Sequence, residues 1–239
     1  MTKTLGIIGG LGPIATAYFM ELIIRMTDAK CDQDHLDVLV YNRPKTPDRT
    51  KYILGLSDED PTPVMIDTGR KLVEQGAECL AIPCITAHYF HERLEGAIGT
   101  PIIHLVREVA LHLKENNIHK VGIMATDGTI TTELFQTELK LQGMDAFIPC
   151  AENQKKVMHL IYDNVKASIS PEMDLFNQVK EDLQGQGAEV IVLGCTELSL
   201  LKRDENIGPG FLDAMEVLSK KAIECCDAKI KEEFHCLIS

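Results

Sequence analysis

Short apolar runs alternate along the whole chain with longer segments that show helical periodicity. The runs are rich in branched side chains and cover residues 5–8, 36–41, 79–85, 101–105, 120–125, 146–148 and 190–193. Between them, apolar positions recur with a period near 3.6, for example at residues 13–26, 131–141, 155–165 and 173–184. Continuously apolar strands separated by helices are typical of parallel sheets that are covered on both faces. We therefore predict an α/β fold with mostly parallel sheets flanked by helices.

The chain contains an internal repeat. The tetrapeptide Gln-Gly-Ala-Glu at residues 75–78 recurs at residues 186–189, and in both places it follows a predicted helix and precedes an apolar strand. A cysteine stands six positions after each glutamate, as Cys84 and Cys195. This agreement in register predicts a duplicated α/β unit. We expect a first half over 1–116, with 212–239 packing back on it, and a second half over 117–211.

The two repeat-matched cysteines are the strongest candidates for chemistry. Both follow a strand, and functional groups in parallel α/β sheets gather at the carboxyl ends of the strands. If the halves face each other around a pseudo-twofold axis, Cys84 and Cys195 point into one cleft from opposite sides. One thiolate could then remove a proton from a carbon while the other thiol protonates the opposite face, which inverts the configuration. The pKa of a thiol, ordinarily about 8.5, falls near helix N-termini, and both cysteines precede a predicted helix.

Composition narrows the class of protein. The 239 residues are 45% hydrophobic and 25% charged, as in an ordinary globular protein. A net charge of −12 disfavours nucleic-acid binding. We find no apolar stretch of membrane-spanning length and no signal-peptide pattern, so we expect no membrane association. The eight cysteines contain no CxxC pair, which favours free thiols in the cytoplasm.

Four segments carry a resemblance to a known family. Gly-Gly-Leu-Gly-Pro-Ile-Ala-Thr at 9–16, Asn-Arg-Pro-Lys-Thr-Pro-Asp-Arg-Thr at 42–50, Pro-Cys-Ile-Thr-Ala-His at 83–88 and Gly-Cys-Thr-Glu-Leu at 194–198 resemble the aspartate/glutamate racemase family, closest to its aspartate racemases. The resemblance covers nearly the whole chain, with the motifs in the family's order. It implies two flavodoxin-like halves with the active site in the cleft between them, racemisation without a cofactor or metal, and a homodimer.

The resemblance also implies roles for individual residues. Cys84 and Cys195 would be the paired acid/base thiols. Arg49 would clamp a substrate carboxylate, for which its planar donor fork is suited, and Lys166 would hold a second carboxylate. Glu197 would contact the substrate ammonium or polarise a neighbour. The remaining expected substrate contacts are Gly10, Ile85, Thr86, Thr126, Thr129 and Thr196.

Ile85 is a departure from the family pattern. The family usually has asparagine directly after the first cysteine, and its amide would help to fix polar substrate groups. The isoleucine leaves both sulfurs in place but bears on which substrate is accepted and how fast it reacts.

Other readings of the same residues stay open. The G-x-G-x-x-A pattern at 10–15 fits a dinucleotide site, although Arg43 follows the second strand where an acidic residue is expected. The histidines His88 and His91 would need a further ligand to hold zinc, and a Cys84–His88 hydrolase would leave Cys195 without a role.

We therefore predict an amino-acid racemase that interconverts L- and D-aspartate, or glutamate, by proton transfer between two cysteines without pyridoxal phosphate. The alternatives are an enzyme of the same superfold with another substrate, such as a broad-specificity racemase, a decarboxylase or a cis–trans isomerase, and an amino-acid-binding relative with weak activity. The expected partner is a small acidic amino acid.

Overall fold

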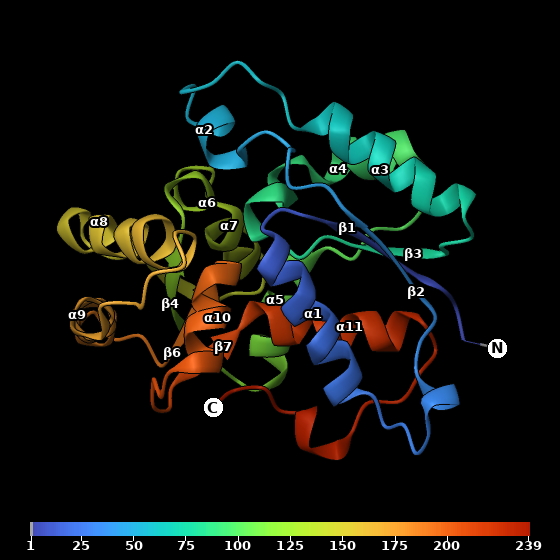
Figure 1. Ribbon diagram of the computed structural model, residues 1–239. Helices are drawn as coiled ribbons and strands as arrows, with labels where there is room; N and C mark the ends of the chain where they lie inside the picture. Colours follow the sequence, from blue (N-terminus) through green and yellow to red (C-terminus); the bar gives the residue numbers. More distant parts are fainter. Residues whose placement is uncertain (1) are drawn as a thin grey trace. The chain divides into compact units, whose positions relative to one another are not determined.

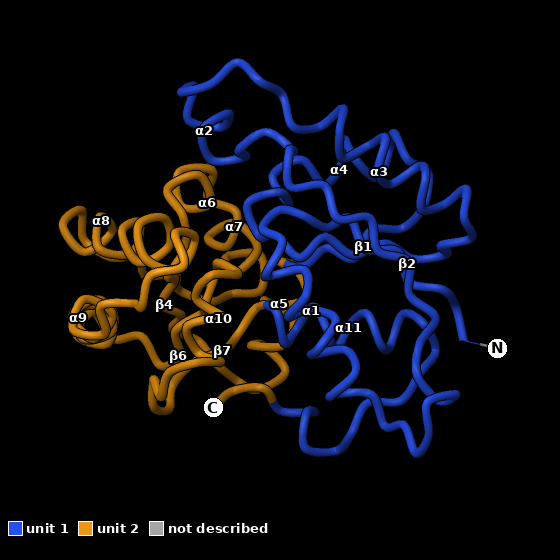
Figure 2. The backbone as a smooth tube through the Cα atoms, in the orientation of Figure 1, with its two compact units in different colours: residues 1–105, 215–236 blue, residues 106–214, 237–239 orange. Residues whose placement is uncertain are grey.

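The computed structural model describes residues 2–239 (Figure 1). The chain forms two compact units, one from residues 1–105 and 215–236 and one from residues 106–214 and 237–239 (Figure 2). The first boundary lies about ten residues before the one expected from sequence. The residues in question form most of helix α5 (Leu105–Glu115), whose Lys114 ammonium donates to Gln142 of the second unit at 3.0 Å. The chain end is shared differently too, since Ser239 N–H donates to the Phe211 carbonyl at 3.0 Å in the second unit.

Unit 1 is built on a three-stranded parallel sheet with the order β2-β1-β3. Its strands are β1 (Leu5–Gly9), β2 (Val38–Asn42) and β3 (Cys79–Ala81). Its helices are α1 (Pro13–Met26), α2 (Arg49–Ile53), α3 (Thr62–Glu74), α4 (His91–Ile98) and α11 (Ala214–Cys225), with 3-10 turns at Asp32–Asp34, Ile85–Phe90 and Glu232–Phe234. Helices α3 and α4 lie on one side of the sheet, and α1 and α11 lie on the other (Figure 1).

Unit 2 contains a four-stranded parallel sheet with the order β5-β4-β6-β7. The strands are β4 (Lys120–Ala125), β5 (Asp145–Phe147), β6 (Val190–Gly194) and β7 (Phe211–Asp213). Besides α5, the helices are α6 (Asp127–Thr131), α7 (Leu134–Leu141), α8 (Ala151–His159), α9 (Met173–Gly185) and α10 (Thr196–Asp204), and a π-helix spans Leu160–Val165. The core includes Phe176 and Phe211, whose ring centroids are 5.5 Å apart.

The repeat seen in the sequence is also a structural repeat. Gly76 and Gly187 end α3 and α9 with φ of 103° and 102°, a left-handed conformation that favours glycine. The glutamate that follows each of them then joins the start of a central strand. Glu78 N–H donates to the Thr4 carbonyl at 2.9 Å, and Glu189 N–H donates to the Lys120 carbonyl at 2.8 Å. The same turn thus sets the register of the strand that leads to each cysteine.

The predicted α/β fold with parallel sheets flanked by helices is confirmed, but one predicted strand is absent, one strand was not predicted and one predicted helix is wound differently. Residues 101–105 make a single bridge, Leu80 with Ile102, because α5 already begins at Leu105. Strand β7 was missed, because its two apolar residues, Phe211 and Leu212, are followed at once by Asp213 and form no longer apolar run. The helix predicted over 155–165 begins at Ala151 and changes to a π-helix at Leu160, a winding that apolar periodicity does not reveal.

No helix in residues 2–239 combines the length and the apolar character needed to cross a membrane.

Candidate active site

Each unit presents a cysteine at the carboxyl end of a strand. Cys84 follows β3 and caps the 3-10 helix Ile85–Phe90, and Cys195 follows β6 and caps α10. Both have extended backbones, with φ of −157° and −145°, and both are 6% exposed. The two cysteines therefore share a local frame, a buried strand that turns sharply into a helix with the thiol at the turn.

In unit 1, Arg49 lies close to the ends of two strands. Asp48 caps α2 by accepting from the Lys51 N–H at 2.9 Å, which fixes Arg49 as the first residue of the helix. The Arg49 guanidinium is buried, and it donates to the Pro47 carbonyl at 2.9 Å and to the Leu11 carbonyl at 3.2 Å. Arg49 therefore ties the loop after β2 to the loop after β1 and places a cation within this edge of the sheet.

Gly10 lies in the loop after β1, where there is no room for a side chain. A side chain at Gly10 would come within 2.4 Å of the Arg43 backbone, and its φ is 91°. Its N–H donates to the Thr16 hydroxyl at 2.9 Å in α1. In this structure Gly10 allows the loops after β1 and β2 to approach closely, and its amide is occupied by Thr16.

The residues after Cys84 are buried and mainly uncharged. Ile85 and Thr86 both lie in the interior of unit 1. Four positions after the cysteine, the buried His88 places its Nε2 3.2 Å from the carbonyl of Ile82, which also accepts from the Cys84 N–H at 2.8 Å. Nδ1 of His88 is buried without a hydrogen-bond partner. The structure therefore shows no Cys84–His88 hydrogen bond, which removes the geometric basis for a hydrolase dyad.

His88 belongs to a cluster of three imidazoles. Its ring centroid lies 6.0 Å from that of His104 and 6.1 Å from that of His91. Burial, together with these two neighbours, lowers the pKa of His88 to about 3. His88 is therefore neutral at physiological pH, and its Nε2–H is a donor to the turn that carries Cys84.

Cys195 has a strongly polar environment in unit 2. Its thiol donates to Oε2 of the buried Glu197 at 2.9 Å, and the Thr196 hydroxyl donates to the same oxygen at 3.0 Å. Nζ of Lys166 lies 3.9 Å from the other oxygen, Oε1. The sequence-predicted residues Cys195, Thr196, Glu197 and Lys166 thus form one connected network.

The network sets the protonation of the thiol. Burial raises the pKa of Cys195 well above the ordinary value for a thiol, and the Glu197 carboxylate raises it further, while the Lys166 ammonium lowers it. In this state Cys195 is a thiol that donates a hydrogen bond, and Glu197 is the acceptor already in contact with its proton.

Thr126 and Thr129 form a second polar turn in unit 2, at the end of β4. Thr126 caps α6 and accepts from the Thr129 N–H at 3.4 Å, and the two hydroxyl oxygens are 3.2 Å apart. Both side chains are buried. The structure thus places two hydroxyls at the carboxyl end of the strand next to the one that leads to Cys195.

Sequence reasoning did not identify every residue of the two cysteine ends, by which we mean the strand ends that carry Cys84 and Cys195 and the side chains around them. Tyr162 lies under Lys166, with the ammonium 4.1 Å from the centroid of its ring. Ser199, four positions after Cys195, donates to Oδ1 of the buried Asp213 at 2.6 Å. The repeat offset could have revealed Ser199, because it corresponds to His88 at the same distance after the other cysteine.

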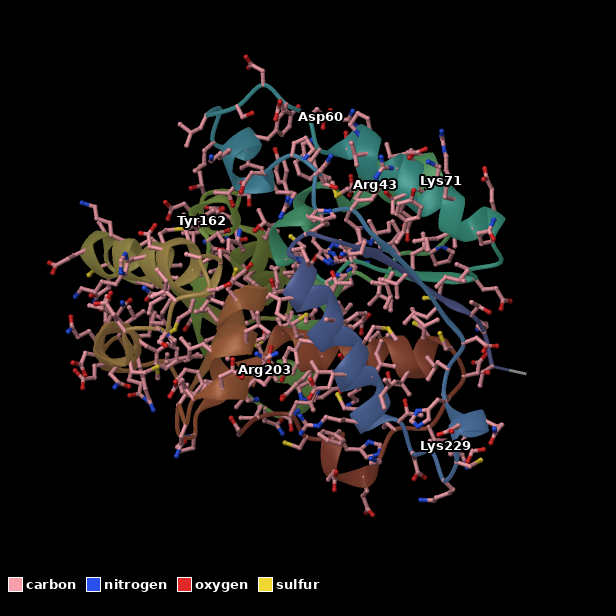
Figure 3. The ribbon with its side chains drawn as sticks, viewed as in Figure 1. Arg43, Asp60, Lys71, Tyr162, Arg203 and Lys229 are labelled. Carbon is pink, nitrogen blue, oxygen red and sulfur yellow. The ribbon has the colours of Figure 1, made fainter. Side chains whose placement is uncertain are left out.

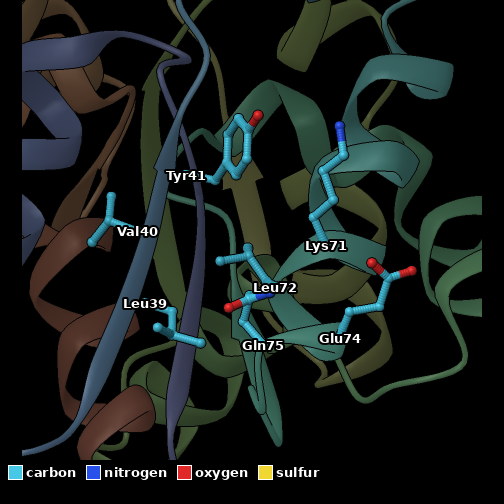
Figure 4. A pocket seen from close by; sticks show the side chains of 7 residues that line it. All are labelled: Leu39, Val40, Tyr41, Lys71, Leu72, Glu74 and Gln75. Atoms are coloured by element: carbon cyan, nitrogen blue, oxygen red, sulfur yellow. The ribbon is translucent and has the colours of Figure 1, made fainter.

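A surface pocket lies elsewhere in unit 1 (Figure 4). It has a volume of about 300 Å³ and is lined by Leu39, Val40, Tyr41, Lys71, Leu72, Glu74 and Gln75, none of which is a predicted site residue. The Asp67 carboxylate beside it pairs with Arg43 and, at 2.9 Å, with Lys71. Arg43 and Lys71 are labelled in Figure 3. The pocket therefore adds nothing to the two cysteine ends.

Among the described residues, no group of three or more histidine, cysteine, aspartate or glutamate side chains is arranged to hold a metal ion. The His88, His91 and His104 rings lie close together, but the carbonyl oxygens of Ile82 and Ile102 are within 3.2 Å of Nε2 of His88 and 2.9 Å of Nε2 of His91. The cluster is therefore built from hydrogen-bonded imidazoles.

Known proteins resemble this chain over most of its length. It is 25% identical over 226 residues to the broad-specificity amino-acid racemase RacX of Bacillus subtilis, covering 92% of this chain and 96% of RacX. The solved aspartate racemase of Picrophilus torridus has 26% identity and a TM-score of 0.84, covering 98% of this chain and 99% of that one.

A more distant solved structure shares the fold. The glutamate racemase of Francisella tularensis, determined with D-glutamate, has a TM-score of 0.68 at 14% identity, covering 93% of this chain and 80% of that one. The Asp/Glu/Hydantoin racemase family matches residues 8–222, which includes both cysteine ends. The chain therefore belongs to the Asp/Glu/Hydantoin racemase family.

Proposed function

We propose that this protein racemises aspartate by transferring protons between Cys84, Cys195 and the α-carbon, without a cofactor. The observation that carries the proposal is the matched pair of cysteines. Each stands at the same turn between a buried strand and a helix, in two units that repeat each other. The likeness to an aspartate racemase over 98% of the chain supports aspartate as the substrate.

The chemistry is a proton transfer in two steps. One cysteine, as thiolate, removes the α-proton and leaves a planar carbanion whose charge spreads onto the α-carboxylate. The other cysteine, as thiol, delivers its proton to the opposite face and becomes the thiolate. The forward reaction thus ends in the protonation state from which the reverse reaction begins, and no electrons are gained or lost.

The residues around Cys195 can prepare that thiol. Glu197 accepts its hydrogen bond at 2.9 Å, so moving the proton onto the carboxylate produces the thiolate without crossing solvent. The Lys166 ammonium stabilises the negative charge of the thiolate and the carboxylate. Thr196 already donates to the same oxygen of Glu197, which keeps the carboxylate oriented toward the sulfur.

Two cations would bind the substrate carboxylates. Arg49 is buried at a sheet edge in unit 1, where the charge is fixed by its contacts to two loop carbonyls. Lys166 is 29% exposed in its side chain and can therefore reach a ligand. A dicarboxylic amino acid has one carboxylate for each. The resemblance further supports a homodimer, which light scattering at several concentrations would test.

The experiment is proton NMR of aspartate, glutamate and several neutral amino acids incubated with the reduced protein in D₂O, with circular dichroism of the same samples. We expect the α-proton signal of aspartate to disappear together with its optical activity. Exchange with no amino acid would contradict the proposal and favour a different reaction of the same superfold or a binding-only relative.

A second candidate is a racemase of broad specificity. The apolar Ile85 is buried directly beside Cys84, where the family usually has an amide, and RacX is described as broad in specificity. In the same experiment this candidate predicts exchange of neutral amino acids at rates comparable to that of aspartate. Replacing Ile85→Asn should then shift the preference toward aspartate.

A further inference from the structure

Lys166 is held at a junction between an aromatic ring and a carboxylate in unit 2. It follows the π-helix Leu160–Val165, and its backbone N–H donates to the Ile161 carbonyl, five residues earlier, at 3.0 Å. Its ammonium lies 4.1 Å from the ring centroid of Tyr162 and 3.9 Å from Oε1 of Glu197. Tyr162 is labelled in Figure 3.

The contact between Tyr162 and Lys166 is close for its type. A cation is attracted to the negative face of an aromatic ring within about 6 Å of the centroid. In the same chain the Lys71 ammonium lies 5.8 Å from the ring of Tyr41, and its side chain is 44% exposed against 29% for Lys166. Lys166 is therefore the nearer and the more enclosed of the two cations.

Neighbouring contacts fix the segment that carries the ring. The buried Asn164 accepts from the Glu172 N–H at 3.2 Å, and His159 bridges Asp163 and Glu172 with 2.8 Å contacts from its two ring nitrogens. Tyr162 itself packs against the core of unit 2. These contacts hold the segment on both sides of Tyr162, and packing against the core holds the ring itself under the ammonium.

The ammonium in turn acts on the thiol. The charged groups that bear on Cys195 are Glu197, from its own helix α10, and Lys166, from the segment after the π-helix. Glu197 opposes ionisation of the thiol and Lys166 favours it. Burial has the largest influence on the thiol, and beyond it the distance of Lys166 from Glu197 and Cys195 affects how much thiolate forms at a given pH.

We propose that Tyr162 is a positioning residue that holds the Lys166 ammonium beside Glu197 and thereby controls the reactivity of the Cys195 thiol. The inference rests on the proposed function only in taking Cys195 as a reacting group. A purely structural role for Tyr162 would instead act through stability and leave the chemistry of the folded thiol unchanged.

The test compares Tyr162→Leu with Tyr162→Phe. Phenylalanine keeps the aromatic face, and leucine keeps an apolar side chain without it. The measurement is the rate of Cys195 alkylation by iodoacetamide between pH 6 and 10, resolved by mass spectrometry, with the exposed Cys150 as internal reference. We expect Tyr162→Leu to move the pH profile of Cys195 alkylation upward by about half to one pH unit. Alkylation at pH 8 should then be about threefold to tenfold slower. Tyr162→Phe should match the wild type.

Two further variants make the result specific. Tyr41→Leu removes the other tyrosine that faces a lysine and should leave Cys195 alkylation unchanged. Lys166→Met should slow alkylation at least as much as Tyr162→Leu, and the double variant should add nothing, since one change displaces and the other removes the same cation. If leucine and phenylalanine at 162 behave alike, or if Lys166→Met alkylates like the wild type, the proposal is overturned. If Tyr162→Leu does not fold, wild-type alkylation of Lys166→Met would still overturn the proposal.

Racemisation measured on the same proteins separates this inference from the proposed function. A shifted alkylation profile in a protein that exchanges no amino acid would support the role of Tyr162 and contradict the racemase. Racemisation with an unchanged alkylation profile would support the racemase and overturn the role of Tyr162.

Discussion

The two cysteine ends share a backbone and differ in their side chains. Cys84 and Cys195 both cap a helix after a buried strand, but Ile85 follows the first, whereas Thr196 and then Glu197 follow the second. The first end is supported by the neutral His88, and the second by the hydrogen bond from Ser199 to Asp213. The two units thus share the position of the sulfur, and in unit 2 the sulfur also contacts the carboxylate of Glu197, which lies beside Lys166.

The position of each sulfur and the protonation of Cys195 therefore depend on different parts of the chain. The turn at each Gln-Gly-Ala-Glu repeat fixes the strand register, and hence the position of each sulfur. At Cys195, burial, Glu197 and Lys166 then act on the ionisation of the thiol. We expect both thiols to be required for racemisation and to differ in their rates of alkylation.

The largest effect should come from removing either sulfur. Cys84→Ala and Cys195→Ala should each lower the racemisation rate about a thousandfold or more, because each removes one of the two proton carriers. The exposed Cys31→Ala is the control and should retain the wild-type rate. Circular dichroism of aspartate measures all three. A variant at 84 or 195 that keeps the wild-type racemisation rate would contradict the proposal that both thiols carry protons.

Glu197→Gln should separate activity from thiol acidity. Racemisation should fall about a hundredfold, because the amide cannot take the proton of Cys195. Alkylation of Cys195 at pH 8 should nevertheless become faster, since the charge that raises the pKa of the thiol is gone. Alkylation of Cys84 should not change. Slower alkylation of Cys195 would contradict the account of this network.

The free energy of unfolding should fall in acid because of His88, which lies four positions after Cys84. Burial holds the pKa of His88 at about 3 in the folded state, against about 6.5 when unfolded. Between these values the unfolded chain binds the proton and the folded chain does not, so stability falls as pH decreases from 6.5 toward 3. The slope should be about 1 kcal/mol per pH unit, and His88→Gln should flatten it. Urea unfolding from pH 7 to 4 measures both, and equal slopes would refute this origin.

The smallest effect concerns the helix cap beside Arg49. Asp48→Ala removes the acceptor of the Lys51 N–H and should reduce the free energy of unfolding by about 1 kcal/mol. It should also raise KM more than it lowers kcat, because Arg49 is the first residue of that helix and the proposed carboxylate clamp. Asp48→Asn preserves a capping oxygen and should restore both values.

The α/β fold class and the positions of both cysteines could be predicted from the sequence, because strands and helix ends leave local signals. The alternation of apolar runs gave the α/β class, and the repeat located both cysteines. Tyr162 was missed because its contact with Lys166 comes from three-dimensional packing around a π-helix, and winding of that kind has no signature in the spacing of apolar residues. Strand β7 depends on pairing with β6 along three residues, which only the folded sheet reveals.

The most direct test of the two-thiol account is the fate of the α-hydrogen in the first turnovers of L-aspartate in D₂O. Two separate proton carriers predict that the D-aspartate formed contains deuterium at the α-carbon, while the L-aspartate still present keeps protium. Mass spectrometry after chiral separation gives both values. D-aspartate that retains protium, or deuterium that enters the remaining L-aspartate as fast as the product, would contradict the account.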